Sequence, residues 1–136
     1  MSKKYTSLGL MSGTSGDGID ASIISSNGDF ETKQENKFNI ISNEYFEYDK
    51  KLFDMIHELK YKIKFSTDLK KNEKLIDKIS REITLFHANV IQKISKTKNI
   101  DIIGFHGHTI FHSPKEKISK QIGDANLLHQ LTKKKI

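Results

Sequence analysis

The chain has 136 residues, of which 35% are hydrophobic and 29% are charged, and its formal net charge is +6 at pH 7. This composition is typical of a globular domain and excludes the polar, aromatic-poor profile of a disordered segment. The absence of cysteine excludes disulfides, thiol catalysis and thiolate metal sites. We therefore expect one folded domain over residues 1–136.

The positive charge does not indicate a nucleic-acid partner. Five of the six excess charges come from lysines at the two ends of the chain, which are Lys3, Lys4, Lys133, Lys134 and Lys135. Arg81 is the single arginine, although arginine is the side chain best suited to bidentate phosphate contacts. The first apolar run, Tyr5–Met11, is too short for a signal peptide or a membrane span. We expect a cytoplasmic protein that binds neither nucleic acid nor membrane.

The first third of the chain predicts three antiparallel strands. The apolar runs Tyr5–Met11 and Ile19–Ser26 flank a glycine-rich turn, a pattern that favours a hairpin. A second turn signal at residues 26–29 leads into a third predicted strand at residues 37–42.

The middle of the chain predicts two amphipathic helices that pack against the sheet. Hydrophobic residues recur at helical spacing after Asp49 and again after a polar break at residues 66–68. We expect the second helix to end near residues 96–99. Three histidines, which are His57, His87 and His129, lie on predicted helices and are expected at surface or boundary positions.

The last third returns to strands. Asp101–Phe105 is a continuous apolar run, which predicts a buried strand in a sheet covered on both faces. A short strand at Ser119–Ile122 is followed by Asp124, a predicted N-cap for a helix of about two turns. We expect that helix to leave exposed an apolar stripe formed by Leu127, Leu128 and Leu131. The fold class is thus α/β, a mixed sheet that opens with an antiparallel three-stranded meander and is packed by helices.

The predicted hairpin turn concentrates groups suited to phosphate binding. Glycines let backbone amides approach phosphate oxygens, hydroxyls add donors, and an aspartate can hold hydrated magnesium. It is neither a Walker loop nor a Rossmann fingerprint, because the Gly-Lys-Ser/Thr ending is missing and a strand follows. A glycine-rich turn of this kind is more often only a turn. The candidate phosphate residues are Ser12, Gly13, Thr14, Ser15, Gly16, Asp17, Gly18 and Ile19.

A second polar segment follows the strand at residues 101–105. His106 and His108 are two apart, which would place them on one strand face, and His112 comes soon after. One interpretation is that these polar residues hold a turn by hydrogen bonds. Another is a histidine-based zinc site completed by Asp101 or Asp124, in a metal-dependent hydrolase or a metal-binding module.

Two blocks of the sequence resemble the anhydro-N-acetylmuramic acid kinase family. Met11–Ser15 followed by Asp17–Asp20 is similar to the family signature of the first phosphate-binding hairpin in an actin-like ATPase, or ribonuclease H-like, fold. Residues 104–114 and Gln121–Asp124 are similar to the family's His-Gly-Gln-Thr, His-x-Pro and Gln-x-Gly-Asp string. His108 departs from the glutamine expected there, although both side chains can donate and accept hydrogen bonds.

The resemblance implies an enzyme that uses ATP and magnesium. It implies phosphorylation of 1,6-anhydro-N-acetylmuramic acid with cleavage of the anhydro ring, which gives N-acetylmuramic acid 6-phosphate in peptidoglycan recycling. Ser12–Ile19 would bind nucleotide, with Asp17 as the magnesium partner. The sugar-side candidates are His106, Gly107, His108, Thr109 and Gln121.

The resemblance also implies missing parts. The general-base aspartate is expected beyond residue 136, so we assign no catalytic residue to this chain. Residues 1–136 would be the truncated N-terminal lobe of an actin-like sugar kinase whose second lobe is absent. We expect such a fragment to be inactive alone, and the alternative to a kinase part is a fragment with no enzymatic role. We also expect it to form a homo-oligomer through exposed apolar surface.

Overall fold

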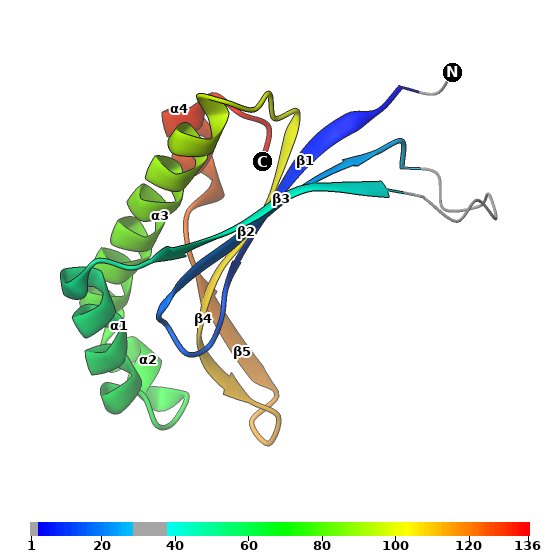
Figure 1. The fold of residues 1–136 in the computed structure, drawn as a ribbon. Coiled ribbons are helices and arrows are strands. Elements are labelled where there is room, and N and C mark those ends of the chain that lie inside the picture. The colour runs from blue at the N-terminus through cyan, green and yellow to red at the C-terminus, as the bar shows by residue number, and fades with distance from the viewer. Residues whose placement is uncertain (1–2, 29–37) are drawn as a thin grey trace.

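The computed structural model describes residues 3–28 and 38–136 of the chain. In these residues a five-stranded sheet carries its helices on one face (Figure 1). The strands are β1 (Tyr5–Ser12), β2 (Gly18–Ser26), β3 (Phe38–Glu47), β4 (Ile102–Ser113) and β5 (Ile118–Ile122). The helices are α1 (Lys50–Lys62), α2 (Thr67–Lys71), α3 (Glu73–Ser95) and α4 (Ala125–Thr132).

The sheet is mixed, with the strand order β3-β2-β1-β4-β5. Strands β1, β2 and β3 form an antiparallel meander, β4 lies parallel to β1, and β5 returns antiparallel to β4. The predicted α/β class and the opening meander are confirmed. Strand β3 continues to Glu47, beyond the predicted end at Ser42, and the predicted turn and strand residues Asp29 and Lys37 lie outside the described residues.

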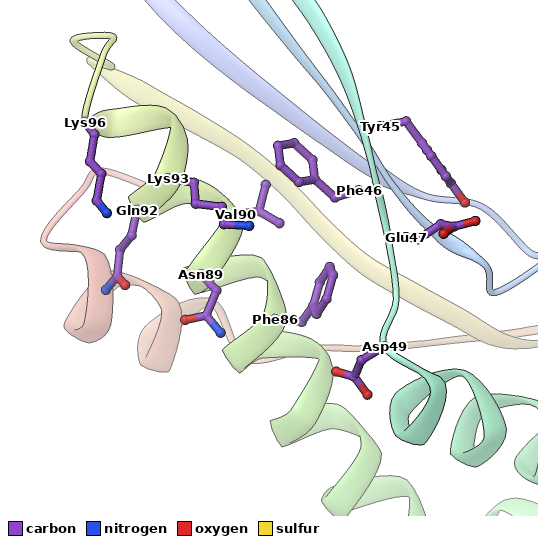
Figure 2. Close-up of a pocket in the computed structure, with 10 residues that line it drawn as sticks. All are labelled: Tyr45, Phe46, Glu47, Asp49, Phe86, Asn89, Val90, Gln92, Lys93 and Lys96. Carbon is purple, nitrogen blue, oxygen red and sulfur yellow. The ribbon is translucent and has the colours of Figure 1, made fainter.

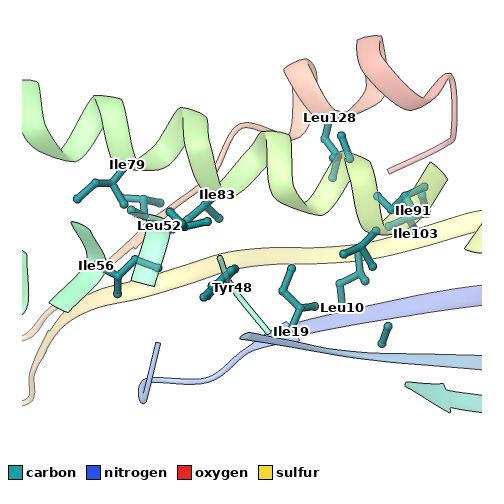
Figure 3. Close-up of a cluster of buried hydrophobic side chains, with 14 of the residues drawn as sticks. Leu10, Ile19, Tyr48, Leu52, Ile56, Ile79, Ile83, Ile91, Ile103 and Leu128 are labelled. Carbon is teal, nitrogen blue, oxygen red and sulfur yellow. The ribbon is translucent and has the colours of Figure 1, made fainter. Parts of the chain in front are cut away.

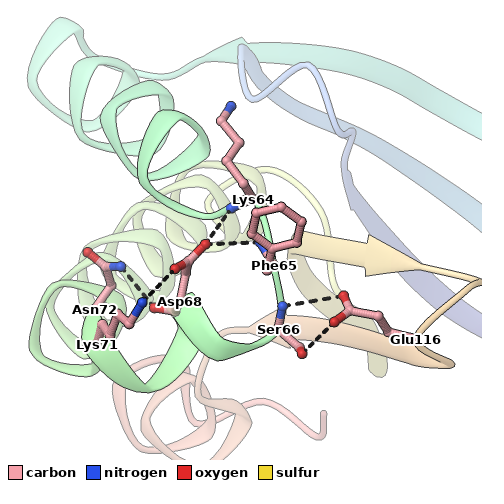
Figure 4. A network of polar contacts seen from close by, with 7 residues as sticks. All are labelled: Lys64, Phe65, Ser66, Asp68, Lys71, Asn72 and Glu116. Carbon is pink, nitrogen blue, oxygen red and sulfur yellow. Dashed lines mark hydrogen bonds and ion pairs between the residues drawn. The ribbon is translucent and has the colours of Figure 1, made fainter.

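A capped turn joins the meander to the helices. Asp49 caps α1 by accepting a hydrogen bond from the Leu52 amide at 2.9 Å, which satisfies one of the free amides of the first helical turn. The polar break predicted after α1 contains the short helix α2. It forms because the Asp68 carboxylate accepts from the Lys64 and Phe65 amides, at 3.0 and 2.9 Å, and turns the chain (Figure 4). These hydrogen bonds lower the pKa of Asp68.

The same connection is attached to the β4–β5 hairpin. The Ser66 hydroxyl donates to Glu116 Oε1 at 2.7 Å, and the Ser66 amide lies 3.3 Å from Glu116 Oε2 (Figure 4). Glu116 lies in the turn between β4 and β5, so the two halves of the chain are joined at this end of the sheet.

The core lies between the helices and one face of the sheet. Figure 3 shows Ile79, Ile83 and Ile91 of α3 above Leu10 and Ile103 of the central strands. Burial of such aliphatic side chains contributes roughly 1.5–3 kcal/mol each. This packing fixes which face of β1 and β4 points inward.

Helix α4 packs on α3 rather than presenting a bare apolar stripe. Leu128 is fully buried, which contradicts the expected exposure of this residue, while Leu131 remains 38% exposed. Asp124 caps α4 by accepting from the Leu127 amide at 2.9 Å, so the predicted N-cap is confirmed.

The opposite face of the sheet has no helix over it in the described part of the chain (Figure 1). Gly104 and Ile102 are exposed there, so the expectation that β4 is covered on both faces is wrong for these residues. The sequence predicts a fully buried strand because residues 102–105 contain no polar side chain. Of these residues, Ile103 is the one buried in the core. Met11 and Ile40 are also exposed, at 58% and 62%.

His87 differs from its predicted surface or boundary position. It is fully buried on α3, where Nδ1 lies 2.8 Å from the Ile83 carbonyl oxygen. Its ring makes a T-shaped contact with Phe105, with 5.0 Å between the ring centroids. Burial lowers the pKa of His87 to about 4. The residue therefore packs as a neutral core side chain.

A further feature of the helices concerns membranes. Among residues 3–28 and 38–136, no helix has both the length and the apolar character needed to cross a bilayer.

Candidate functional site

The turn between β1 and β2 is held against α1. Gly16 donates its amide to the Gly13 carbonyl oxygen at 3.0 Å and has a φ of +74°. A Cβ at Gly16 would lie 2.8 Å from Ile56 Cγ2, so only glycine allows both this conformation and this approach to the helix. Thr14 and Ser15 are exposed at the tip.

The residues at the two ends of this segment face the protein interior. Gly18 is buried, and a Cβ there would overlap the Phe46 carbonyl oxygen of β3. Ile19 is fully buried in the core, and Ser12 is 3% exposed. The candidate phosphate residues thus divide into an exposed tip and inward-facing flanks, with Asp17 exposed beside the tip.

Two side chains of α1 approach the turn and were missed by the sequence analysis. Lys60 Nζ donates to the carbonyl oxygens of Thr14 and Ser15, at 2.8 Å for the second. His57 Nε2 lies 3.8 Å from Asp17 Oδ1. Helical spacing places His57 and Lys60 beside the buried Ile56, but no signal in the sequence places that flank opposite the hairpin.

A buried polar chain links β1, β4 and the end of β3. Ser12 stands directly opposite His108 in the parallel register, and Ser12 Oγ lies 2.8 Å from His108 Nδ1 and 2.6 Å from Tyr48 Oη. Burial raises the pKa of Tyr48 to about 12. Burial, together with the nearby Lys60 ammonium, lowers the pKa of His108 to about 4. Both groups are therefore neutral at pH 7.

A bulge in β4 turns His108 inward. The register shifts between the Leu10–Phe105 and Ser12–His108 pairs, and Gly107 within this bulge has a φ of +74°. A Cβ at Gly107 would overlap the Ile122 carbonyl oxygen of β5. The extra residue leaves His106 exposed and His108 fully buried, because side chains alternate between faces except where a bulge intervenes.

The bulge also separates two of the histidines of the predicted zinc site. His106 and His108 do not share a face, contrary to the expectation from their spacing. In the part of the chain that the structure describes, no group of three or more histidine, cysteine, aspartate or glutamate side chains could hold a metal ion. The zinc alternative therefore lacks the ligand cluster that it requires.

The remaining sugar-side candidates lie on the β4–β5 hairpin. Thr109 and Gln121 are paired across these strands, and Gln121 Nε2 lies 3.4 Å from Thr109 Oγ1. His106 and Gln121 are exposed, and Thr109 is half-buried. Because β4 is the neighbour of β1, the structure brings this segment and the first strand of the predicted phosphate hairpin side by side.

A separate groove of about 650 Å³ lies between the end of β3 and α3 (Figure 2). It is lined by Tyr45, Phe46, Glu47, Asp49, Phe86, Asn89, Val90, Gln92, Lys93 and Lys96. None of the candidate phosphate or sugar-side residues lines this groove, so it is not the site predicted from the sequence.

Comparison with known proteins identifies the family. Residues 5–136 match the family model for anhydro-N-acetylmuramic acid kinase. The chain belongs to the anhydro-N-acetylmuramic acid kinase family. The matched region contains both the β1–β2 hairpin and the β4–β5 segment, and the mixed sheet agrees with a partial actin-like ATPase lobe.

Relatives named anhydro-N-acetylmuramic acid kinase show the same relationship. One from Pelagibacter ubique (strain HTCC1062) is 51% identical over 138 residues, covering 100% of this chain and 35% of the relative. One from Agrobacterium fabrum is 31% identical over 137 residues, covering 97% of this chain and 35% of the relative. The chain thus spans about a third of the length of these curated relatives of the kinase family.

Proposed function

We propose that this chain supplies the nucleotide-phosphate hairpin and the sugar-side strand of an ATP-dependent anhydro-N-acetylmuramic acid kinase. The reaction is phosphorylation of 1,6-anhydro-N-acetylmuramic acid with opening of the anhydro ring to give N-acetylmuramic acid 6-phosphate. The observation that carries the proposal is the pairing of Ser12 with His108. It joins the two sequence blocks, otherwise far apart in the chain, at the same end of adjacent strands.

In this proposal the hairpin tip binds the phosphates. Gly13–Asp17 contains backbone amides and the hydroxyls of Thr14 and Ser15, which can donate to phosphate oxygens. Ser12 and Ile19 contribute through the backbone, since their side chains face the core. His106, Thr109 and Gln121 offer exposed or half-buried polar groups to the sugar, whereas Gly107 and His108 shape β4.

Asp17 fits the magnesium that a kinase requires. Its side chain is 53% exposed, and its Oδ1 lies 3.8 Å from His57 Nε2. Magnesium keeps several waters and is commonly held by one or two carboxylates together with substrate phosphates. When bound, the ion would neutralise developing charge on the phosphates. Asp17 is thus free to accept such an ion beside the hairpin tip.

Further parts of the proposal concern the whole enzyme. Ring opening needs a general base to activate water. We assign that base to the part of the enzyme that corresponds to the unmatched remainder of the Pelagibacter ubique relative, of which this chain covers 35%. Residues 1–136 are proposed to form part of the N-terminal lobe of an actin-like kinase. A cytoplasmic location follows from the proposed use of ATP.

The proposal is tested by exchange with a relative. Residues 1–136 replace the matching third of the Pelagibacter ubique kinase, and ADP release is measured with the anhydro sugar by a coupled assay. We expect the chimera to turn over, the Asp17→Asn chimera to lose most activity, and the isolated chain to show no turnover. A folded chimera without activity contradicts the proposed function, and so does full activity in the Asp17→Asn chimera.

A further inference from the structure

Lys60 contacts the hairpin turn from the side of α1. Its ammonium group donates to the carbonyl oxygens of Thr14 and Ser15. Within residues 3–28 and 38–136, no other side chain forms a hydrogen bond with residues 13–16. Lys60 therefore holds the two tip carbonyls in addition to the backbone hydrogen bond from the Gly16 amide to the Gly13 carbonyl oxygen.

The direction of these carbonyls sets the direction of an amide. A trans peptide group points its C=O and its N–H in opposite directions. Because the Thr14 carbonyl points to Lys60, the Ser15 amide of the same peptide points away from α1. In the described residues the Ser15 amide has no acceptor, and Ser15 is exposed. The Gly16 amide is already used in the turn.

Lys60 differs from its neighbour Lys62 on the same helix. Lys62 forms an exposed ion pair with Glu58 at 2.5 Å, a contact within α1 that reaches no other element. Lys60 is partly desolvated, which lowers its pKa, although Asp17 acts in the opposite direction. A lysine that gives up hydration must gain strong partners, and those partners are the tip carbonyls.

We propose that Lys60 is a positioning residue for phosphate binding. By holding the Thr14 and Ser15 carbonyls it presents the Ser15 amide, outward and without an internal acceptor, to a phosphate oxygen of the nucleotide. An amide fixed in this orientation binds an anion without first reorganising, which is the benefit of a preorganised donor. This inference rests on the proposed function, because it takes the hairpin to be the phosphate site.

The test compares Lys60→Gln with Lys62→Gln in the 15N-labelled chain. Both variants remove one positive charge from α1, two residues apart, so the second controls for net charge. Two quantities are measured by NMR: the exchange rate of the Gly16 amide, and the dissociation constant for magnesium-ATP from the shifts of residues 13–17. Lys60→Arg, which keeps a cationic donor, is the conservative variant.

We expect Lys60→Gln to raise Gly16 exchange and to weaken magnesium-ATP binding, each by about tenfold, the effect of losing a hydrogen bond to a charged donor. Lys62→Gln should change neither, and Lys60→Arg should restore both in part. Weaker binding with unchanged Gly16 exchange would mean that Lys60 contacts phosphate directly, which overturns the positioning role. The positioning role is also overturned if Lys60→Gln and Lys62→Gln have the same Gly16 exchange rate and the same dissociation constant for magnesium-ATP.

Failure of the proposed function gives a different result. In that case wild type shows no shift of residues 13–17 with magnesium-ATP, whatever Lys60→Gln does to Gly16 exchange.

Discussion

Ser12 of β1 and His108 of β4 face each other in the parallel register, with 2.8 Å between Ser12 Oγ and His108 Nδ1. The contact is buried and continues to the hydroxyl of Tyr48, the residue that follows β3, so it links β1 and β4 to the connection between β3 and α1. It joins β1 of the hairpin to β4, the strand that carries the predicted sugar-side residues.

The first prediction concerns this buried chain. Ser12→Ala leaves the Tyr48 hydroxyl and the His108 ring nitrogen without their partner, which costs about 1–3 kcal/mol for each buried group left unsatisfied. Urea unfolding should show the free energy of unfolding falling by at least the lower value. Ser22→Ala, on the exposed face of β2, should stay within about 0.5 kcal/mol of wild type. If Ser12→Ala is as stable as Ser22→Ala, the hydrogen bonds of Ser12 to His108 and Tyr48 do not stabilise the fold.

The second prediction concerns the bulge. Gly107 and Gly28 both have a φ of +74°, but a Cβ at Gly28 meets no atom within 4 Å, whereas one at Gly107 overlaps the Ile122 carbonyl oxygen. Gly28→Ala should cost about 1–2 kcal/mol from backbone strain alone. Gly107→Ala should cost a further 1–3 kcal/mol, roughly that of overpacking. Thermal or urea unfolding of the two variants measures the difference, and equal losses would show that the close approach is not real.

The same bulge shows where the sequence analysis was insufficient. Hydrophobic patterning predicts α1, α3 and the existence of the strands, though not the full length of β3 and β4, and the residue type at Asp124 predicts the cap of α4. These features depend on residues close together in the chain. His106 and His108 lie on opposite faces because of the bulge at Gly107, which has a positive φ. An isolated glycine in the sequence of a strand does not show whether the strand is bulged or regularly paired there.

The missed contacts have a similar cause. Lys60 is 45 residues from Ser15 in the chain, and a lysine on a predicted amphipathic helix reads as a solvated side chain. The burial of His87 likewise depends on its position beside Phe105 of β4. Such contacts are fixed by how α1 and α3 lie across the sheet, which local sequence patterns do not specify.

The third prediction concerns acid stability. His87 and His108 have folded pKa values of about 4, below the ordinary 6.5 that applies when unfolded. The unfolded chain therefore binds more protons between these values, so stability is greatest above pH 6.5 and falls as the pH drops toward 4. Each histidine contributes at most about 1.4 kcal/mol per pH unit.

Urea unfolding at several pH values between 5 and 6.5 measures this slope. His108→Gln removes one of the two titrating groups and keeps hydrogen-bonding capacity, so the slope in this window should fall by about half. A slope that is unchanged in His108→Gln would show that His108 is not held neutral by burial.

The fourth prediction concerns oligomerisation. The uncovered sheet face exposes Ile40 and Met11, and exposed apolar patches tend to find a partner. Sedimentation should show association that increases with protein concentration. Ile40→Lys should reduce it, while Tyr61→Lys, on the exposed side of α1, should not. A concentration-independent monomer contradicts this prediction.

The central claim is that the β1–β2 hairpin binds nucleotide phosphate, and a titration of the 15N-labelled chain with ATP tests it most directly. In the presence of magnesium we expect saturable shifts in the amides of residues 13–17, and without magnesium we expect these shifts to weaken because Asp17 then repels the nucleotide. If residues 13–17 do not move, or if the shifts occur only in the lysine-rich residues 133–135, the hairpin is not a phosphate site and the account is wrong.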